Sequence, residues 1–200
     1  MAPESTRSGA VGVILPEDWF AIPLTDDTAR TRAVAALVER QLDGTHAGPA
    51  LRRDLHDQLK SQTAAARHAG GWLMAISLMR VRGAPVPASL VCAREGGAGL
   101  PGRTLEEIFD DLSREGGPTA TVDAARGPWS TVVRRVVEPA DGSSDSTQTP
   151  QLTATYYLDP GDGHGVIVLA FASPALDLRD GLLKLFDTVA MGVQRLSDGG

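Results

Sequence analysis

The hydrophobic pattern of this chain changes its period at Gly70–Gly71. Before this point apolar residues recur every three or four positions, which is typical of amphipathic helices. After it they form extended runs. The first, WLMAISLMRV from Trp72, is apolar on both alternating faces and predicts an interior strand. The change therefore predicts an α+β fold, with four helices packed on a mainly antiparallel sheet of about five to seven strands.

Two helices are expected between Thr25 and Gly70, and the short connection between them predicts a helical hairpin. Thr25 is placed to cap the first helix, and Asp26 and Asp27 then lie near the positive end of its dipole. Pro49 suits the first turn of the second helix. The apolar positions of the two helices are Val34, Leu37, Val38, Leu42, Leu51, Leu55 and Leu59.

Later elements are marked by capping and by extended apolar runs. Thr104 and Glu107 form a capping box for a short third helix, and VPASLVCA predicts an antiparallel partner for the Trp72 strand. Further strands are expected near 119–125, 129–138, 152–158 and 166–172. We expect residues 1–9 to be disordered, residues 10–197 to form a single domain, and a loop near 140–150 to be mobile.

A long C-terminal helix is the clearest single element. Its apolar positions follow the helical period over about five turns. They are Leu178, Leu182, Leu185, Phe186, Val189, Val193 and Leu196. The neighbouring strand VIVLAFA is apolar on both faces, so we expect it to cover this helix in the core.

Charge and cysteine content exclude several classes of protein. The formal net charge of −6 disfavours a general affinity for nucleic acid or for anionic membranes. The single cysteine, Cys92, allows no intrachain disulfide. No apolar run approaches the roughly 20 residues that a membrane-spanning helix needs, which predicts no integral membrane association. The N-terminus lacks the apolar stretch of a signal peptide, so we expect a cytoplasmic protein.

Five segments together resemble a known fold family. They are LPEDWFAIPL, PVPASLVCA, ARGPWSTVVRR, TYYLDP and VIVLAFASP. Their order resembles the Mog1/PsbP-like α/β domains, and particularly the uncharacterised actinobacterial members of that group. The resemblance implies a fold that serves binding and assembly more often than catalysis. It also implies a connection with bacterial secretion or envelope systems.

The sharpest motif is a literal G-x-G-x-x-G formed by Gly97, Gly99 and Gly102. It follows a predicted strand, precedes a helix, and has Asp123 about 20 residues later, which matches a dinucleotide-binding fingerprint. Pro101 disfavours helical geometry at the residue before it, so the helix starts too late for its amides to meet a pyrophosphate. The motif therefore leaves two alternatives, a nucleotide site and a strand-to-helix loop.

Other reactive side chains have simpler interpretations. Cys92 lies between apolar neighbours, which favours a small core residue over a nucleophile. His56 and His68 fall about 120° apart around one helix, so they share no face for a metal. One turn contains Asp159, Asp162 and His164, and its Asp-Pro-Gly and Asp-Gly sequences favour turn formation over metal binding. We therefore predict no catalytic residue, no metal ligand and no cofactor.

These observations favour a non-catalytic function. The leading hypothesis is a protein-binding adaptor, assembly factor or chaperone-like module whose partner is unknown. The alternative is a nucleotide-binding enzyme or ligand sensor that uses the Gly97–Gly102 loop with Asp123. The alanine-rich helical hairpin is a candidate partner surface, and it also favours a homodimer, although its alanines equally suit packing within one chain.

Overall fold

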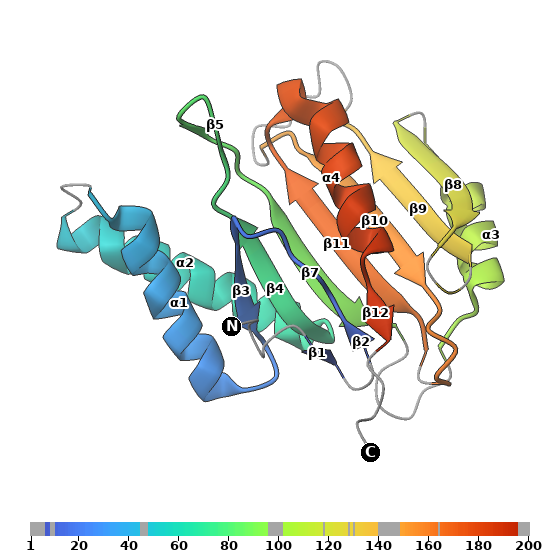
Figure 1. Cartoon of the computed structure of the whole chain (residues 1–200), viewed down its shortest axis with the longest axis horizontal. Coiled ribbons are helices and arrows are strands. Elements are labelled where there is room, and N and C mark those ends of the chain that lie inside the picture. Colours follow the sequence, from blue (N-terminus) through green and yellow to red (C-terminus); the bar gives the residue numbers. More distant parts are fainter. Residues whose placement is uncertain are drawn as a thin grey trace.

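The computed structural model describes residues 7–8, 11–44, 48–95, 102–117, 119–127, 129, 131–139, 149–163 and 165–195. Its centre is a seven-stranded antiparallel sheet with the order β3-β4-β7-β11-β10-β9-β8 (Figure 1). In that order the strands are Trp19–Pro23, Gly71–Ser77, Ser89–Arg94, Ile167–Ser173, Leu152–Leu158, Thr131–Val137 and Ala120–Arg126. The predicted α+β class and the antiparallel sheet are confirmed. Within the described residues no helix is long and apolar enough to cross a membrane.

One face of the sheet is covered by helix α4 (Arg179–Met191), which follows a short 3-10 helix, η1 (Leu176–Leu178). Phe186 of α4 is fully buried and stacks on Phe171 of β11, with ring centroids 4.4 Å apart. Tyr156 of β10 meets Phe171 edge-on. The expected cover of this helix by the VIVLAFA strand is therefore confirmed.

The C-terminal helix is shorter than the sequence predicts. It ends at Gly192, and the chain continues into β12 (Gln194–Arg195), so the predicted extension to Leu196 is wrong. Strand β12 pairs with β2 (Val11–Gly12), which in turn pairs with β1 (Arg7–Ser8). Of the segment 1–9, for which the sequence predicts disorder, Arg7 and Ser8 form β1 and the other residues lie outside the described ones.

The opposite face of the sheet carries the helical hairpin at one end. Helices α1 (Asp27–Leu42) and α2 (Pro49–His68) pack against each other and against β3 and β4. Ion pairs Arg67–Asp27 and Arg52–Glu39 join the two helices. The N-cap of α1 is Asp26 and not Thr25, because the Asp26 carboxylate accepts from two backbone amides.

Helix α3 (Leu105–Glu115) covers the other end of this face. The Thr104–Glu107 capping box is present as predicted. Ile108 and Leu112 pack with Val133 of β9 over strands β8 and β9. A small arm, β5 (Arg80–Val81) and β6 (Ala84–Pro85), projects between β4 and β7. The expected mobile loop near 140–150 lies, for residues 140–148, outside the described residues.

Candidate functional site

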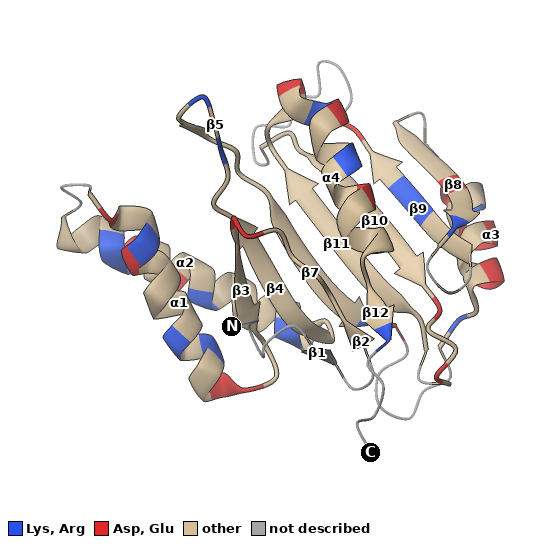
Figure 2. Cartoon of the chain, in the orientation of Figure 1, with Lys and Arg blue, Asp and Glu red and all other residues tan. Residues whose placement is uncertain are grey.

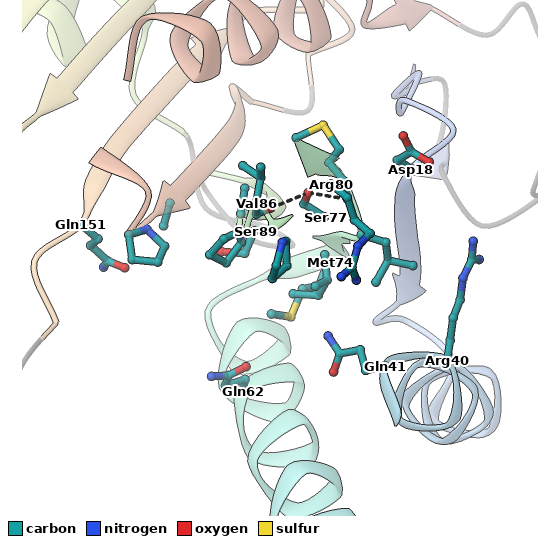
Figure 3. Close-up of a pocket in the computed structure, with 18 of the residues that line it drawn as sticks. Asp18, Arg40, Gln41, Gln62, Met74, Ser77, Arg80, Val86, Ser89 and Gln151 are labelled. Atoms are coloured by element: carbon teal, nitrogen blue, oxygen red, sulfur yellow. Dashed lines mark hydrogen bonds between the residues drawn. The ribbon is translucent and has the colours of Figure 1, made fainter. Parts of the chain in front are cut away.

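An open cleft lies where the helical hairpin meets the sheet. It has a volume of about 860 Å³ and takes residues from α1, α2, β4, β7 and the β5–β6 arm. Met74 and Ser89 belong to the sheet, and Figure 3 shows Arg40 and Gln62 approaching from the two helices. Gln151, which precedes β10, lies at the other end of the cleft. The cleft thus joins segments that are far apart in the sequence.

The sheet side of the cleft is mainly apolar. Met74 is buried and packs with Ile76, whereas Met79 also lines the cleft but packs against the core cluster that contains α4. Pro85 and Pro174 add further apolar surface. Methionine side chains are unbranched and polarizable, so a cleft lined by two of them can adapt to partners of different shape.

Two serine hydroxyls hold the walls of the cleft, and both already form hydrogen bonds within the chain. Ser77 Oγ donates to the carbonyl of Val86 at 2.9 Å and accepts from the amide of Met79 at 3.2 Å. Ser173 Oγ donates to the carbonyl of Pro87 at 2.6 Å and accepts from the amide of Ala175 at 3.1 Å. These hydrogen bonds fix the loop on either side of the β5–β6 arm, so both serines stabilise the cleft.

The rim of the cleft carries polar side chains without partners. In the described part of the chain, the side chains of Asp18, Arg40, Gln62 and Gln151 form no hydrogen bond and no ion pair. Charged and amide groups of this kind bind protein backbone or side chains readily. The rim therefore offers donors and acceptors around an apolar wall.

A smaller groove of about 600 Å³ lies on the other side of the β5–β6 arm, against the start of α4. Val81 and Leu176 line it and are 49% and 36% exposed. Met79 and Val86 line both this groove and the cleft. The arm therefore stands between two apolar surfaces.

The structure describes two residues of the predicted nucleotide fingerprint, Gly102 and Asp123, and does not bring them together. Gly97 and Gly99 lie outside the described residues. Gly102 lies against the carbonyl of Glu95, just after β7. Asp123 lies on β8, and strands β11, β10 and β9 separate β8 from β7. The described geometry therefore offers no shared site for Gly102 and Asp123.

Asp123 takes part in a charged network that the sequence analysis missed. Arg134 Nη2 lies 2.7 Å from Asp123, and Arg134 Nη1 lies 2.9 Å from Asp187 of α4. The Tyr156 hydroxyl donates to Asp187 at 2.8 Å. Burial, aided by the neighbouring Asp187 carboxylate, raises the pKa of Tyr156 well above its ordinary value. The network holds α4 against the sheet. The signal in the sequence that could have indicated it was the alternation of side chains along a strand, which places Arg134 and Arg135 on opposite faces.

The other sequence candidates have structural roles. Cys92 is fully buried in the core, as predicted, and burial raises the pKa of its thiol. Asp159 accepts from the amide of Gly161 at 2.7 Å, and Asp162 pairs with Arg94 at 2.6 Å. His164 lies outside the described residues. Within those residues, no group of three or more His, Cys, Asp or Glu side chains is placed to hold a metal.

Comparison with models of known protein families and with curated protein sequences finds no match for this chain. The resemblance to Mog1/PsbP-like domains therefore stays a prediction from the sequence.

Proposed function

We propose that this chain is a non-catalytic protein-binding module, and that a segment of its partner binds in the cleft between the helical hairpin and the sheet. The observation that carries the proposal is an adaptable apolar wall with a polar rim, where Asp18, Arg40 and Gln62 have no side-chain partner among the described residues. Apolar contact surrounded by a polar rim is the usual anatomy of a protein interface.

The shape of the cleft favours a macromolecular partner over a small molecule. Small-molecule sites bury most of the surface of their ligand. This cleft is open to solvent, and its lining extends from the end of α1 to Gln151 (Figure 3). A chain segment can follow such a surface and bury its own apolar side chains against Met74 and Met79.

The resemblance to Mog1/PsbP-like domains supports the same proposal at a finer level. We propose that the module acts in the cytoplasm of an actinobacterium, as an adaptor or chaperone-like factor for a secretion or envelope system. The net charge of −6 is consistent with a protein partner and disfavours nucleic acid.

Site-specific photo-crosslinking in the native cells tests this proposal. A photoreactive residue replaces Gln62 at the cleft, and a matched variant carries it at Lys184, which is exposed on the outer face of α4. We expect a protein cross-linked from Gln62 and not from Lys184. No cross-link at Gln62, or the same cross-links from both positions, would contradict the proposal.

A further inference from the structure

Within the described part of the chain, two central strands of the sheet carry a helix on one face only. On β10 and β11 every side chain that faces α4 is buried. Every side chain on the opposite face is half-buried or exposed. These residues are Thr153, Thr155, Tyr157, Val168, Ala170 and Ala172. Tyr157 packs beside α3, and the other five residues form a strip between α2 and α3 that no described helix covers, which we call the open strip.

The open strip has the width of one helix. Helix α2 packs on β4 and α3 packs on β9, and four inter-strand steps separate these two strands. At about 4.8 Å a step, the two helices lie about 19 Å apart. Helices that pack side by side have axes 8–10 Å apart, so about one helix completes this layer.

The floor of the open strip suits close contact with a helix. Cross-strand pairing places Val91, Ala170 and Thr155 in one row, and Ser89, Ala172 and Thr153 in the next. These side chains are small or β-branched and allow a helix to approach closely. Strands β10 and β11 contain no charged residue, as Figure 2 shows.

A cation with one unsatisfied donor lies at the α3 side of the open strip. Arg135 pairs across the strands with Thr155 and continues the row of Ala170. Its Nε is buried and has no hydrogen-bond partner among the described residues, where its guanidinium also forms no ion pair. Arg134, on the other face, is satisfied by Asp123 and Asp187. A buried donor without a partner is costly, and a carboxylate would satisfy it strongly.

We propose that an amphipathic helix of the partner protein docks on the open strip, with small or aliphatic residues toward Ala170 and a carboxylate that pairs with Arg135. This inference rests on the proposed function and names the chemistry of the partner. The open strip is continuous with the cleft, because Ala172 belongs to both and its cross-strand neighbour Ser89 also lines the cleft. One helix therefore contacts the sheet while the chain beside it enters the cleft.

A displayed library of helical peptides of about 18 residues, about 27 Å long, is the probe. The library is selected against the full chain, and the affinity of each selected peptide is measured by fluorescence polarisation. We expect the selected helices to contain Asp or Glu on or beside the apolar face. Ala170→Arg should weaken the binding of the selected peptides by about tenfold or more, and Arg135→Gln should weaken it by about tenfold. Arg135→Lys should recover part of the lost affinity. Thr188→Arg on the outer face of α4 is the control and should leave binding unchanged.

Circular dichroism of each variant confirms that it is folded. Failure to select any helix, or selected helices that are insensitive to both Ala170→Arg and Arg135→Gln, would overturn this inference. If a protein still cross-links from Gln62 in the Ala170→Arg variant as in the wild type, the inference fails and the proposed function stands. If the Gln62 cross-link is also absent from the wild type, both fail.

Discussion

Phe171 of the sheet and Phe186 of α4 are stacked face to face, with ring centroids 4.4 Å apart and an angle of 18° between the ring planes. Both rings are buried in the core, and Tyr156 and Trp19 approach Phe171 edge-on. This contact joins the C-terminal helix to the centre of the sheet.

Phe186→Ala should destabilise the whole domain, because it leaves a cavity beneath α4. Truncating a buried Phe costs about 3–5 kcal/mol, a large part of a domain stability of about 5–15 kcal/mol. Urea unfolding followed by circular dichroism measures the change. Thr188→Ala, at an exposed position of the same helix, is the control and should have little effect. A Phe186→Ala variant as stable as the wild type would show that α4 is not part of the core.

Asp26→Ala should lower the melting temperature at neutral pH. The amides of Ala29 and Thr28 donate to the Asp26 carboxylate and hold its pKa below the ordinary value. A lowered pKa stabilises the fold above the unfolded-state pKa, and this contribution is lost as the pH falls through the folded-state pKa. Thermal melts at pH 7 and at about pH 3 should therefore show that the difference in melting temperature between the wild type and Asp26→Ala becomes smaller in acid. If the difference in melting temperature is the same at the lower pH, the lowered pKa of Asp26 is not its cause. Asp54→Ala on α2 is the control.

Gly71→Ala should weaken the attachment of the helical hairpin. A Cβ at Gly71 would lie 2.6 Å from the carbonyl oxygen of Ala66, which belongs to the backbone of α2. Relieving this overlap must shift α2 away from β4, at a cost of about 1–3 kcal/mol. Gly181→Ala meets nothing within 4 Å and should stabilise α4 by about 0.4–1 kcal/mol. Equal melting temperatures for the two variants would contradict the close packing of α2 on β4.

NAD, NADP and ATP should each leave the melting temperature unchanged. A ligand that binds only the native state raises the melting temperature by mass action. Asp123, on β8, is held by Arg134, and three strands separate β8 from β7, the strand that precedes Gly102. A thermal shift that is present in the wild type and lost in Asp123→Asn would instead establish the nucleotide-binding alternative.

Much of the fold could be predicted because local patterns and burial agree. The capping box at Thr104 and the both-faces-apolar strand after Trp72 each specify an element without long-range information. The end of α4 could not be predicted in this way. Val193 is buried after the helix has ended, so the apolar period continues past Gly192. Periodicity reports burial, and it does not report which backbone hydrogen bonds are made.

The candidate site was beyond prediction from local sequence. The cleft needs Arg40, Gln62, Met74 and Gln151 in one place, and only the tertiary arrangement of α1, α2 and the sheet brings them together. The open strip depends on where the described helices pack on one face of the sheet. The unsatisfied Nε of Arg135 depends on the side chains that surround it.

Methionine methyl NMR tests the central claim most directly. Met74 and Met79 line the cleft, whereas Met191 is 38% exposed at the end of α4. The full chain, labelled with ¹³C at the methionine methyl groups, is titrated with the protein that cross-links from Gln62. The account predicts that the Met74 and Met79 resonances shift on binding while Met191 keeps its position. A shift of Met191 with Met74 and Met79 unchanged would place the partner on α4 and contradict the account.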